Sequence, residues 1–344
     1  MEPEHMTRNT PQAGGATPSS PMLRGIRKPD FFVVGAPKCG TTAIHTYLSS
    51  HPDVYMAKKE RHFFGKDLRP AGYAGPHNDL DWYLDFFKGW SGERRVGEVS
   101  VWYLYSRTAA QEIKAFNPEA DIVVMLRNPV DMIHSLYNMF VWVKDLTPGG
   151  VIDAETKQAL TLEEALETQE RRKAAFEQCA LDPAFGRNRR AELRLFHTDV
   201  AMYAAQVQRY FEAFGREHVH VILYDDLKRD PATTYAGLLA FLGVDPVLPE
   251  RFEVINSNRE IKNARLHYLL KTHDSMGRIR HYGRRLVPVS WRKKVHRWLM
   301  DLNVRRKPRE PMPEHIRTFL RDKFRPDVER LSALLDRDLV ALWY

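Results

Sequence analysis

The chain contains little of what a secreted or membrane-spanning protein needs. Two cysteines among 344 residues are too few for a disulfide framework, and so low a content is typical of a reducing compartment. No apolar run approaches the roughly 18 residues of a membrane-spanning helix. Residues 1–28 are rich in Pro, Gly, Ser and Thr and lack the apolar core of a signal peptide. We therefore expect a disordered N-terminal tail on a cytoplasmic domain.

The commonest nucleotide-binding loop, GxxxxGK[ST], in which lysine directly follows the second glycine, is also missing. In its place the segment FFVVGAPKCGTT, residues 31–42, carries threonine after the second glycine and lysine inside the turn. This order predicts a strand, a loop whose N–H groups face a phosphate, and a helix N-terminus that adds positive potential. The loop is expected to bind phosphate without the lysine placement that neutralises a γ-phosphate in kinases and ATPases.

Strand-like and helix-like segments alternate along most of the chain. Apolar runs predict strands at residues 31–35, 96–99, 121–126 and 219–224. Helical spacing and end signals predict helices at residues 41–50, 108–116, 199–214 and 231–243. Such βαβ units favour an α/β fold with a mostly parallel central sheet flanked by helices, in which ligands bind at the carboxyl ends of the strands. We expect one domain, residues 29–344, with a helical insertion at residues 144–194 and a helical C-terminal region.

An arginine occupies one of these predicted strand ends. Arg127 directly follows the apolar run at residues 121–126. A guanidinium there has no evident structural purpose, whereas its planar fork suits a phosphate. Ser135 follows in the next predicted helix, where spacing alone gives a serine no particular role.

Three segments together resemble the sulfotransferases that use 3′-phosphoadenosine 5′-phosphosulfate (PAPS). The loop at residues 35–42 is similar to the family's GxxKxGTT loop, and LRNPVDMIHSLY, residues 126–137, is similar to its LRNPxxRxxSxY segment. Residues 59–64, KERHFF, resemble the K-E-x-H-F-F stretch of the carbohydrate-type branch. Their order and spacing identify the chain as a member of the carbohydrate-type or bacterial branch, with a P-loop-like fold. The resemblance covers about residues 28–344.

The resemblance implies a role for each candidate site residue. The expected donor is PAPS, and its 5′ end is held by Lys38, Cys39, Gly40, Thr41 and Thr42. Arg127 and Ser135 hold its 3′-phosphate. Glu60 is the expected catalytic base and Lys38 the group that stabilises the departing charge, while His62 either orients Glu60 or is itself the base. No metal is expected, because Lys38 and Arg127 supply the neutralising charge. Without the resemblance, residues 59–64 fit a solvated charge run followed by core residues equally well.

Two positions depart from the heparan-type pattern. Gly65 stands where those members carry an acidic residue after H-F-F, and Val99 stands where they carry a lysine after Gly-Glu. Both positions contact acceptor sugar in that branch, so the departures argue against a heparan-like acceptor. A sugar, a lipid headgroup, a peptide tyrosine and a small metabolite all stay open, as do transfer to oxygen and to nitrogen.

The positive charge of the chain is concentrated in one segment. Residues 271–310 hold 13 Lys and Arg against 3 Asp and Glu, a net charge of 13 − 3 = +10. This exceeds the net charge of +8 of the whole chain. Such a segment attracts polyanions, so we expect either a contact with an anionic acceptor or a membrane surface, or a solvated face. A nucleic-acid partner is not expected.

Two other functions fit part of the pattern. A nucleotide-dependent kinase or switch protein would need GK[ST] and an acidic Mg²⁺ ligand at a strand end, where this chain has Arg127. A non-catalytic module could keep the fold and bind a polyanion through residues 271–310. The complete donor motif and Glu60 argue against that second alternative.

Overall fold

The structure is a computed structural model of the chain. It describes residues 26–69, 75–142, 158–179, 197–252, 259–261, 304–306 and 311–344. The predicted tail at residues 1–28 and the basic segment at residues 271–310 therefore lie largely outside the described residues, and both stay predictions. The cytoplasmic location likewise stays a prediction from the low cysteine content.

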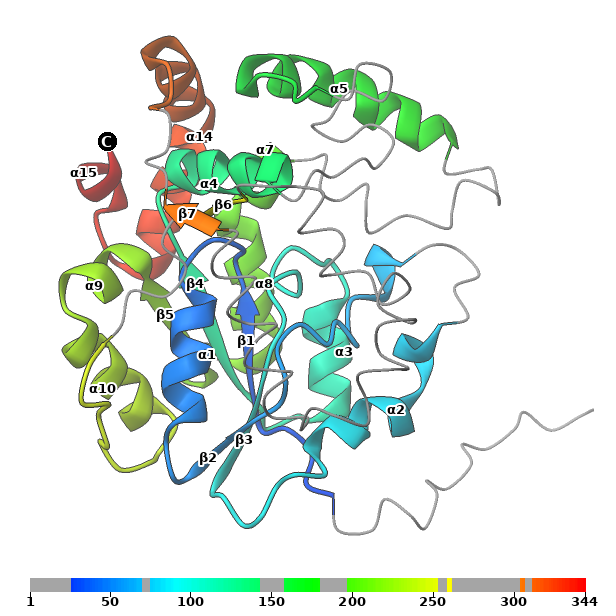
Figure 1. The fold of residues 1–344 in the computed structure, drawn as a ribbon, viewed down its shortest axis with the longest axis vertical. Helices are drawn as coiled ribbons and strands as arrows, with labels where there is room; N and C mark the ends of the chain where they lie inside the picture. The colour runs from blue at the N-terminus through cyan, green and yellow to red at the C-terminus, as the bar shows by residue number, and fades with distance from the viewer. Residues whose placement is uncertain are drawn as a thin grey trace, which may run out of the picture.

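A five-stranded parallel sheet forms the centre of the molecule (Figure 1). The strands lie in the order β2-β3-β1-β4-β5, and each neighbouring pair is parallel. Their bounds are β1 (Phe31–Gly35), β2 (Val54–Met56), β3 (Arg95–Val99), β4 (Asp121–Leu126) and β5 (Val219–Leu223). The predicted α/β fold is confirmed. Every residue of β1 is buried, as expected for a central strand covered on both faces.

One strand of the central sheet was not predicted from the sequence. β2 has only three residues, and two of them, Tyr55 and Met56, are half-buried. So short an edge strand has too little apolar periodicity to be distinguished from a loop. Its position matters, because the segment that carries Glu60 begins just beyond it.

Helices cover both faces of the sheet (Figure 1). The connecting helices are α1 (Thr41–Ser49), α3 (Ala109–Phe116), α4 (Pro129–Trp142), α8 (Tyr203–Phe214) and α10 (Pro231–Phe241). α8 packs on β4, β5 and α3, whereas α1 contacts β2, and α10 packs on β5. α10 begins as predicted, because the Asp230 side chain accepts a hydrogen bond from the Thr233 N–H over 3.0 Å.

Shorter elements complete the connections. They are η2 (Lys66–Leu68), η3 (Pro76–Asn78), α2 (Leu80–Leu84), η4 (Asp85–Phe87), α7 (His197–Val200), η6 (Arg216–His218) and α9 (Tyr224–Arg229). The helix predicted at residues 199–214 is thus divided into α7 and α8. Within the predicted insertion, the structure describes α5 (Leu162–Cys179). Two further strands, β6 (Arg259–Ile261) and β7 (Val304–Arg306), pair antiparallel in a separate sheet.

The C-terminal region is helical, as predicted. α14 (Glu314–Leu335) packs on α8 and α4, and α15 (Leu339–Trp343) packs on α14. The Trp343 indole donates to Asp225 over 3.0 Å, and the Asn128 amide donates to the Trp343 carbonyl over 2.9 Å. These two bonds fasten the C-terminal helix to residues that follow β5 and β4. No helix in the described part of the chain is both long and apolar enough to cross a membrane.

The packing of β3 against β1 generates a stability prediction. A Cβ added at Gly97 would lie 2.1 Å from the Phe31 ring, within the buried core. We expect Gly97→Ala to lower the free energy of unfolding by about 1–3 kcal/mol, the usual cost of overpacking. The measurement is the urea midpoint at constant slope.

Gly237 is the matched control, because it lies inside α10 and a Cβ there meets nothing within 4 Å. Gly237→Ala should raise the free energy of unfolding by about 0.5–1 kcal/mol. Equal effects of the two substitutions would contradict the packing described here.

Candidate active site

The phosphate loop between β1 and α1 has the geometry that its sequence predicts. Gly40 immediately precedes α1 with φ 92°, a conformation that side chains rarely permit. An added Cβ there would also approach the Tyr224 ring to 3.1 Å. Since glycine has no capping side chain, the first N–H groups of α1 are left for another acceptor. Lys38, in the same turn, also has a positive φ of 64°.

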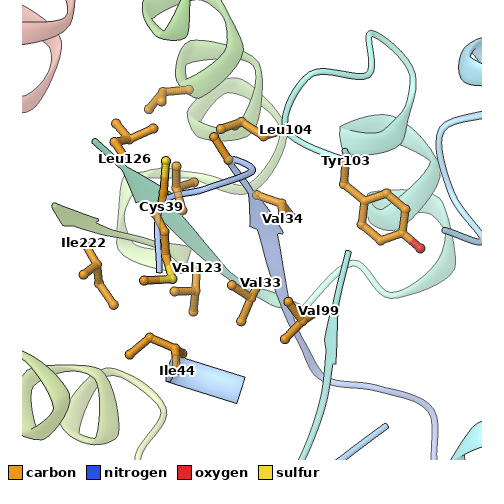
Figure 2. Packing of buried hydrophobic residues seen from close by; sticks show 14 of the residues in the cluster. Val33, Val34, Cys39, Ile44, Val99, Tyr103, Leu104, Val123, Leu126 and Ile222 are labelled. Atoms are coloured by element: carbon orange, nitrogen blue, oxygen red, sulfur yellow. The ribbon is translucent and has the colours of Figure 1, made fainter. Parts of the chain in front are cut away.

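Cys39 points its side chain inward from this loop. It is fully buried, and Figure 2 draws it among core residues that include Val123 and Leu126 of β4. The thiol donates to the Pro37 carbonyl over 3.3 Å. Burial raises the pKa of Cys39 to about 12, against the opposing charge of Arg127. The thiol therefore stays protonated, and only the backbone of Cys39 is available to a ligand.

Lys59 joins the phosphate loop to the candidate base. Its Nζ atom donates to the Thr41 hydroxyl over 3.0 Å and to the Thr42 hydroxyl over 2.9 Å. The same ammonium lies 3.3 Å from Oε1 of Glu60. Each threonine accepts through a lone pair and so keeps its own proton for another acceptor. Sequence reasoning had left Lys59 without a role, although it is the first residue of the K-E-x-H-F-F match.

Glu60 and His62 form a close pair at the carboxyl end of β2. The His62 Nε2 atom lies 2.8 Å from Oε2 of Glu60, the oxygen that Lys59 does not contact. Burial raises the pKa of Glu60, but the hydrogen bond and charge of His62, with those of Lys59, outweigh it and hold this pKa below its ordinary value. Glu60 is therefore ionised at neutral pH. About a third of its side chain is exposed, so the carboxylate is accessible from solvent.

The backbone at these two residues is unusual. Glu60 has φ 67° and His62 has φ 50°, and neither is a glycine. Positive φ values at non-glycine residues cost of order 1–3 kcal/mol and persist where the surroundings impose them. Together with Lys38, three of the candidate site residues share this conformation.

Arg127 is linked to the phosphate loop through Tyr224. Its guanidinium stacks over the Tyr224 ring at 4.8 Å, and Tyr224 is the ring that approaches Gly40. Its closest recorded carboxylate is that of Asp131 on α4, at 3.8 Å. Ser135 lies one helical turn beyond Asp131, on the same face of α4, and is buried. Both predicted 3′-phosphate residues thus follow β4, and Arg127 meets the loop that follows β1 through Tyr224.

All of these groups lie beyond the carboxyl ends of parallel strands. Lys38 follows β1, the pair of Glu60 and His62 follows β2, and Arg127 follows β4. Recorded contacts join Lys59, Thr41, Thr42, Glu60 and His62 into one cluster. Arg127 belongs to a second group that meets the loop through Tyr224. The site therefore places the positive groups of Lys59 and Arg127 close to a loop suited to anions.

Comparison with known proteins agrees with this arrangement. The family described as "Sulfotransferase domain" matches residues 28–306. The chain belongs to the sulfotransferase family. A crystal structure of a sulfotransferase from Alicyclobacillus acidocaldarius is 31% identical, with a TM-score of 0.63, and the match covers 92% of this chain and 99% of that one. The predicted family is confirmed.

Curated relatives in the family match over shorter parts of their length. The human bifunctional heparan sulfate N-deacetylase/N-sulfotransferase 2 is 26% identical over 229 residues, 64% of this chain and 23% of that protein. The mouse carbohydrate sulfotransferase 15 is 25% identical over 284 residues, 69% of this chain and 47% of that protein. The chain thus spans less than half the length of either relative.

The structure gives physical reasons for the two departures from the heparan-type pattern. Gly65 has φ 80°, and a Cβ there would lie 3.1 Å from the Ser106 hydroxyl. An acidic side chain would therefore be strained at this position. Val99 is fully buried in the sheet, and Figure 2 draws it beside Val33 of β1. Neither residue offers a side chain to an acceptor.

Lys59 generates a prediction about the titration of Glu60. Lys59→Met should raise the pKa of the Glu60 carboxyl, because both the charge and the hydrogen bond of Lys59 lower it. The carboxylate would then take up its proton at a higher pH than in the wild type. The measurement is a carboxyl-carbon NMR titration.

Lys58→Met is the matched control, since Lys58 is the adjacent lysine and is exposed. It should leave the Glu60 titration nearly unchanged. An unaltered Glu60 pKa in Lys59→Met would show that the ammonium does not lie where the structure has it.

Proposed function

We propose that this chain transfers a sulfuryl group from PAPS to a hydroxyl or amine of an acceptor, with Glu60 as general base. The observation that carries the proposal is the Lys59 ammonium, which contacts both loop hydroxyls and the Glu60 carboxylate. This contact holds a base beside the loop that would bind the 5′ end of the donor. A phosphate-binding module without chemistry would have no use for an ionised carboxylate there.

The donor-binding residues fit the two ends of PAPS. The N–H groups at the start of α1 and the protons of Thr41 and Thr42 would hold the 5′-phosphate, with Lys38 in the same turn. Arg127 and Ser135 would hold the 3′-phosphate. PAPS supplies an activated sulfuryl group whose transfer leaves a bisphosphate. Lysine and arginine at this loop supply positive charge, so we expect donor binding without a metal.

The acceptor side depends on the Glu60 and His62 pair. Glu60 is ionised and would accept the proton of the attacking hydroxyl or amine. His62 contacts the second carboxylate oxygen over 2.8 Å and would fix its orientation. Lys38 would stabilise the charge that develops on the departing bisphosphate. The human and mouse relatives named above are a heparan sulfate N-sulfotransferase and a carbohydrate sulfotransferase, which supports a carbohydrate acceptor for this chain too.

Donor binding gives the first test of this function. The protein should bind 3′-phosphoadenosine 5′-phosphate in the presence of EDTA and bind ATP poorly, because ATP lacks the 3′-phosphate that Arg127 would contact. Arg127→Ala should weaken binding of the bisphosphate by about 1.5–3 kcal/mol, which is roughly 10- to 150-fold. Isothermal titration calorimetry measures both ligands.

Arg94→Ala is the control for the loss of an arginine. Arg94 directly precedes β3, at the amino end of the sheet, and its side chain is 56% exposed. Its substitution should leave the affinity unchanged. Tight, magnesium-dependent ATP binding with no response to the bisphosphate would favour the kinase or switch alternative.

Substitution of Glu60 and substitution of Lys38 should impair activity in different ways. Glu60→Gln keeps the shape but cannot accept the proton, so kcat should fall by ~10²–10⁴ with donor affinity retained. Lys38→Ala should lose about 2.7–4 kcal/mol of transition-state stabilisation together with some donor affinity. Steady-state kinetics with labelled PAPS and a panel of carbohydrate, lipid and phenolic acceptors measure these changes.

His62→Ala separates the two candidate bases. If Glu60 is the base, His62→Ala should reduce kcat less than Glu60→Gln does. Near-normal kcat in Glu60→Gln with its loss in His62→Ala would reverse the roles. Full activity in both variants would place the base elsewhere.

A further inference from the structure

A second glutamate, Glu98, lies beneath the candidate base and is fully buried near the carboxyl end of β3. Its Oε1 atom accepts hydrogen bonds from the Ser100 hydroxyl over 2.6 Å and from the Tyr103 hydroxyl over 2.8 Å. Its Oε2 atom accepts from the Tyr83 hydroxyl. A carboxyl group in the core is costly unless it is hydrogen-bonded in this way. Three hydroxyls thus donate to a carboxyl group that has no contact with solvent.

Two of the three hydroxyls, those of Ser100 and Tyr103, also form hydrogen bonds with the segment that carries the base. The Ser100 hydroxyl accepts the His62 N–H over 3.0 Å. The Tyr103 hydroxyl accepts the Phe63 N–H over 2.8 Å and the Phe64 N–H over 3.2 Å. A hydroxyl has one proton, and here it is directed to Glu98. The lone pairs are consequently turned toward the three amides.

These amides belong to a segment whose backbone conformation is unfavourable for its side chains. Glu60 and His62 both have positive φ, which their side chains disfavour. The Glu60 N–H donates to the Val99 carbonyl over 2.8 Å, so the segment is also bonded to the last residue of β3. Glu98 itself makes no recorded contact with the Glu60 carboxylate. The hydroxyls of Ser100 and Tyr103 are the hydrogen-bonded route from Glu98 to residues 62–64.

We propose that Glu98 is a positioning residue for the base. By orienting the hydroxyls of Ser100 and Tyr103, it fixes the backbone of residues 62–64 and so holds the Glu60 and His62 pair beside the phosphate loop. This inference rests on the proposed sulfuryl transfer. It adds that buried residues of the sheet and its following loop determine where the Glu60 carboxylate lies, and that residues contacting the acceptor do not. Burial raises the pKa of Glu98, and the hydrogen bonds from its hydroxyl partners and the charge of His62 oppose that rise.

Two tyrosines provide a matched test. Tyr103 and Tyr83 are both fully buried and both donate to Glu98, but only the Tyr103 hydroxyl also accepts from the backbone of Phe63 and Phe64. Tyr83→Phe keeps the ring that stacks on Phe63 at 4.2 Å. Each substitution thus removes one hydroxyl from the same carboxyl, and only one of them breaks the link to the base.

We expect Tyr103→Phe to lower kcat by about 10- to 100-fold, the scale of a small misplacement of a reacting group, while the donor KM changes less than about twofold. Tyr83→Phe should change kcat less than about threefold. Glu98→Gln should retain most of the activity, because its amide oxygen can still accept from Ser100 and Tyr103, whereas Glu98→Leu should not. Equal losses in the two tyrosine variants, or a normal kcat in Tyr103→Phe, would overturn the proposal.

A second readout does not depend on activity. The NMR titration of the Glu60 carboxyl and the amide shifts of residues 62–64 should change in Tyr103→Phe and stay as in the wild type in Tyr83→Phe. Ser100→Ala should alter the His62 amide alone, which keeps the proposal testable if Tyr103→Phe folds poorly. Absence of sulfuryl transfer in the wild type would refute the proposed function, whereas unchanged titrations and shifts would refute the positioning role.

Discussion

The ammonium of Lys59 is the contact on which the candidate site depends. It lies between the phosphate loop that follows β1 and the carboxylate that follows β2, two segments from strands that are not neighbours in the sheet. Lys59 contacts both the hydroxyls of the loop and the Glu60 carboxylate, and so links the two groups. With it, a donor phosphate and an acceptor proton can be handled within one hydrogen-bonded cluster. The distance between the two chemical functions is then fixed by covalent and hydrogen-bond geometry.

The sheet imposes the second constraint. Parallel strands place their carboxyl ends on one edge, and the residues there must adopt whatever backbone the site requires. Lys38, Glu60 and His62 all have positive φ, so local preferences of the chain oppose this geometry. At Glu60 and His62 this geometry is supported by the bond from the Glu60 N–H to Val99 and by the Ser100 and Tyr103 hydroxyls, which themselves donate to the buried Glu98 carboxyl. If Glu98 positions the base as proposed, the geometry of the site depends on the core of the sheet.

The sequence predicts a large part of this arrangement, for reasons that can be traced to particular residues. β1 and β4 are continuous apolar runs whose ends are marked by Gly35 and Arg127, so both strands could be placed, and the phosphate-binding role of the residues that follow them stays a prediction. β2 could not be placed, because a strand of three residues, two of them half-buried, is too short to show a hydrophobic period. Lys59 was overlooked for a different reason. A lysine in a charged run looks solvated until the fold brings Thr41 and Thr42 within 3.0 Å of it. Glu98 likewise gives no sign in the sequence of the three hydroxyls that surround it.

The ion pairs of the site differ in how readily a donor could replace them. Arg127 and Asp131 are 3.8 Å apart, and the carboxylate is 42% exposed. So long an ion pair with a partly exposed carboxylate contributes little, although Arg127 itself is mostly buried and also stacks over the Tyr224 ring. Glu60, in contrast, has His62 at 2.8 Å on one oxygen and Lys59 at 3.3 Å on the other. Its carboxylate is thus held by two cationic partners, whereas the only carboxylate paired with Arg127 in the described residues is a distant one. Under the proposed function, this difference suits a site in which the donor must displace the partner of Arg127 while the base stays in place.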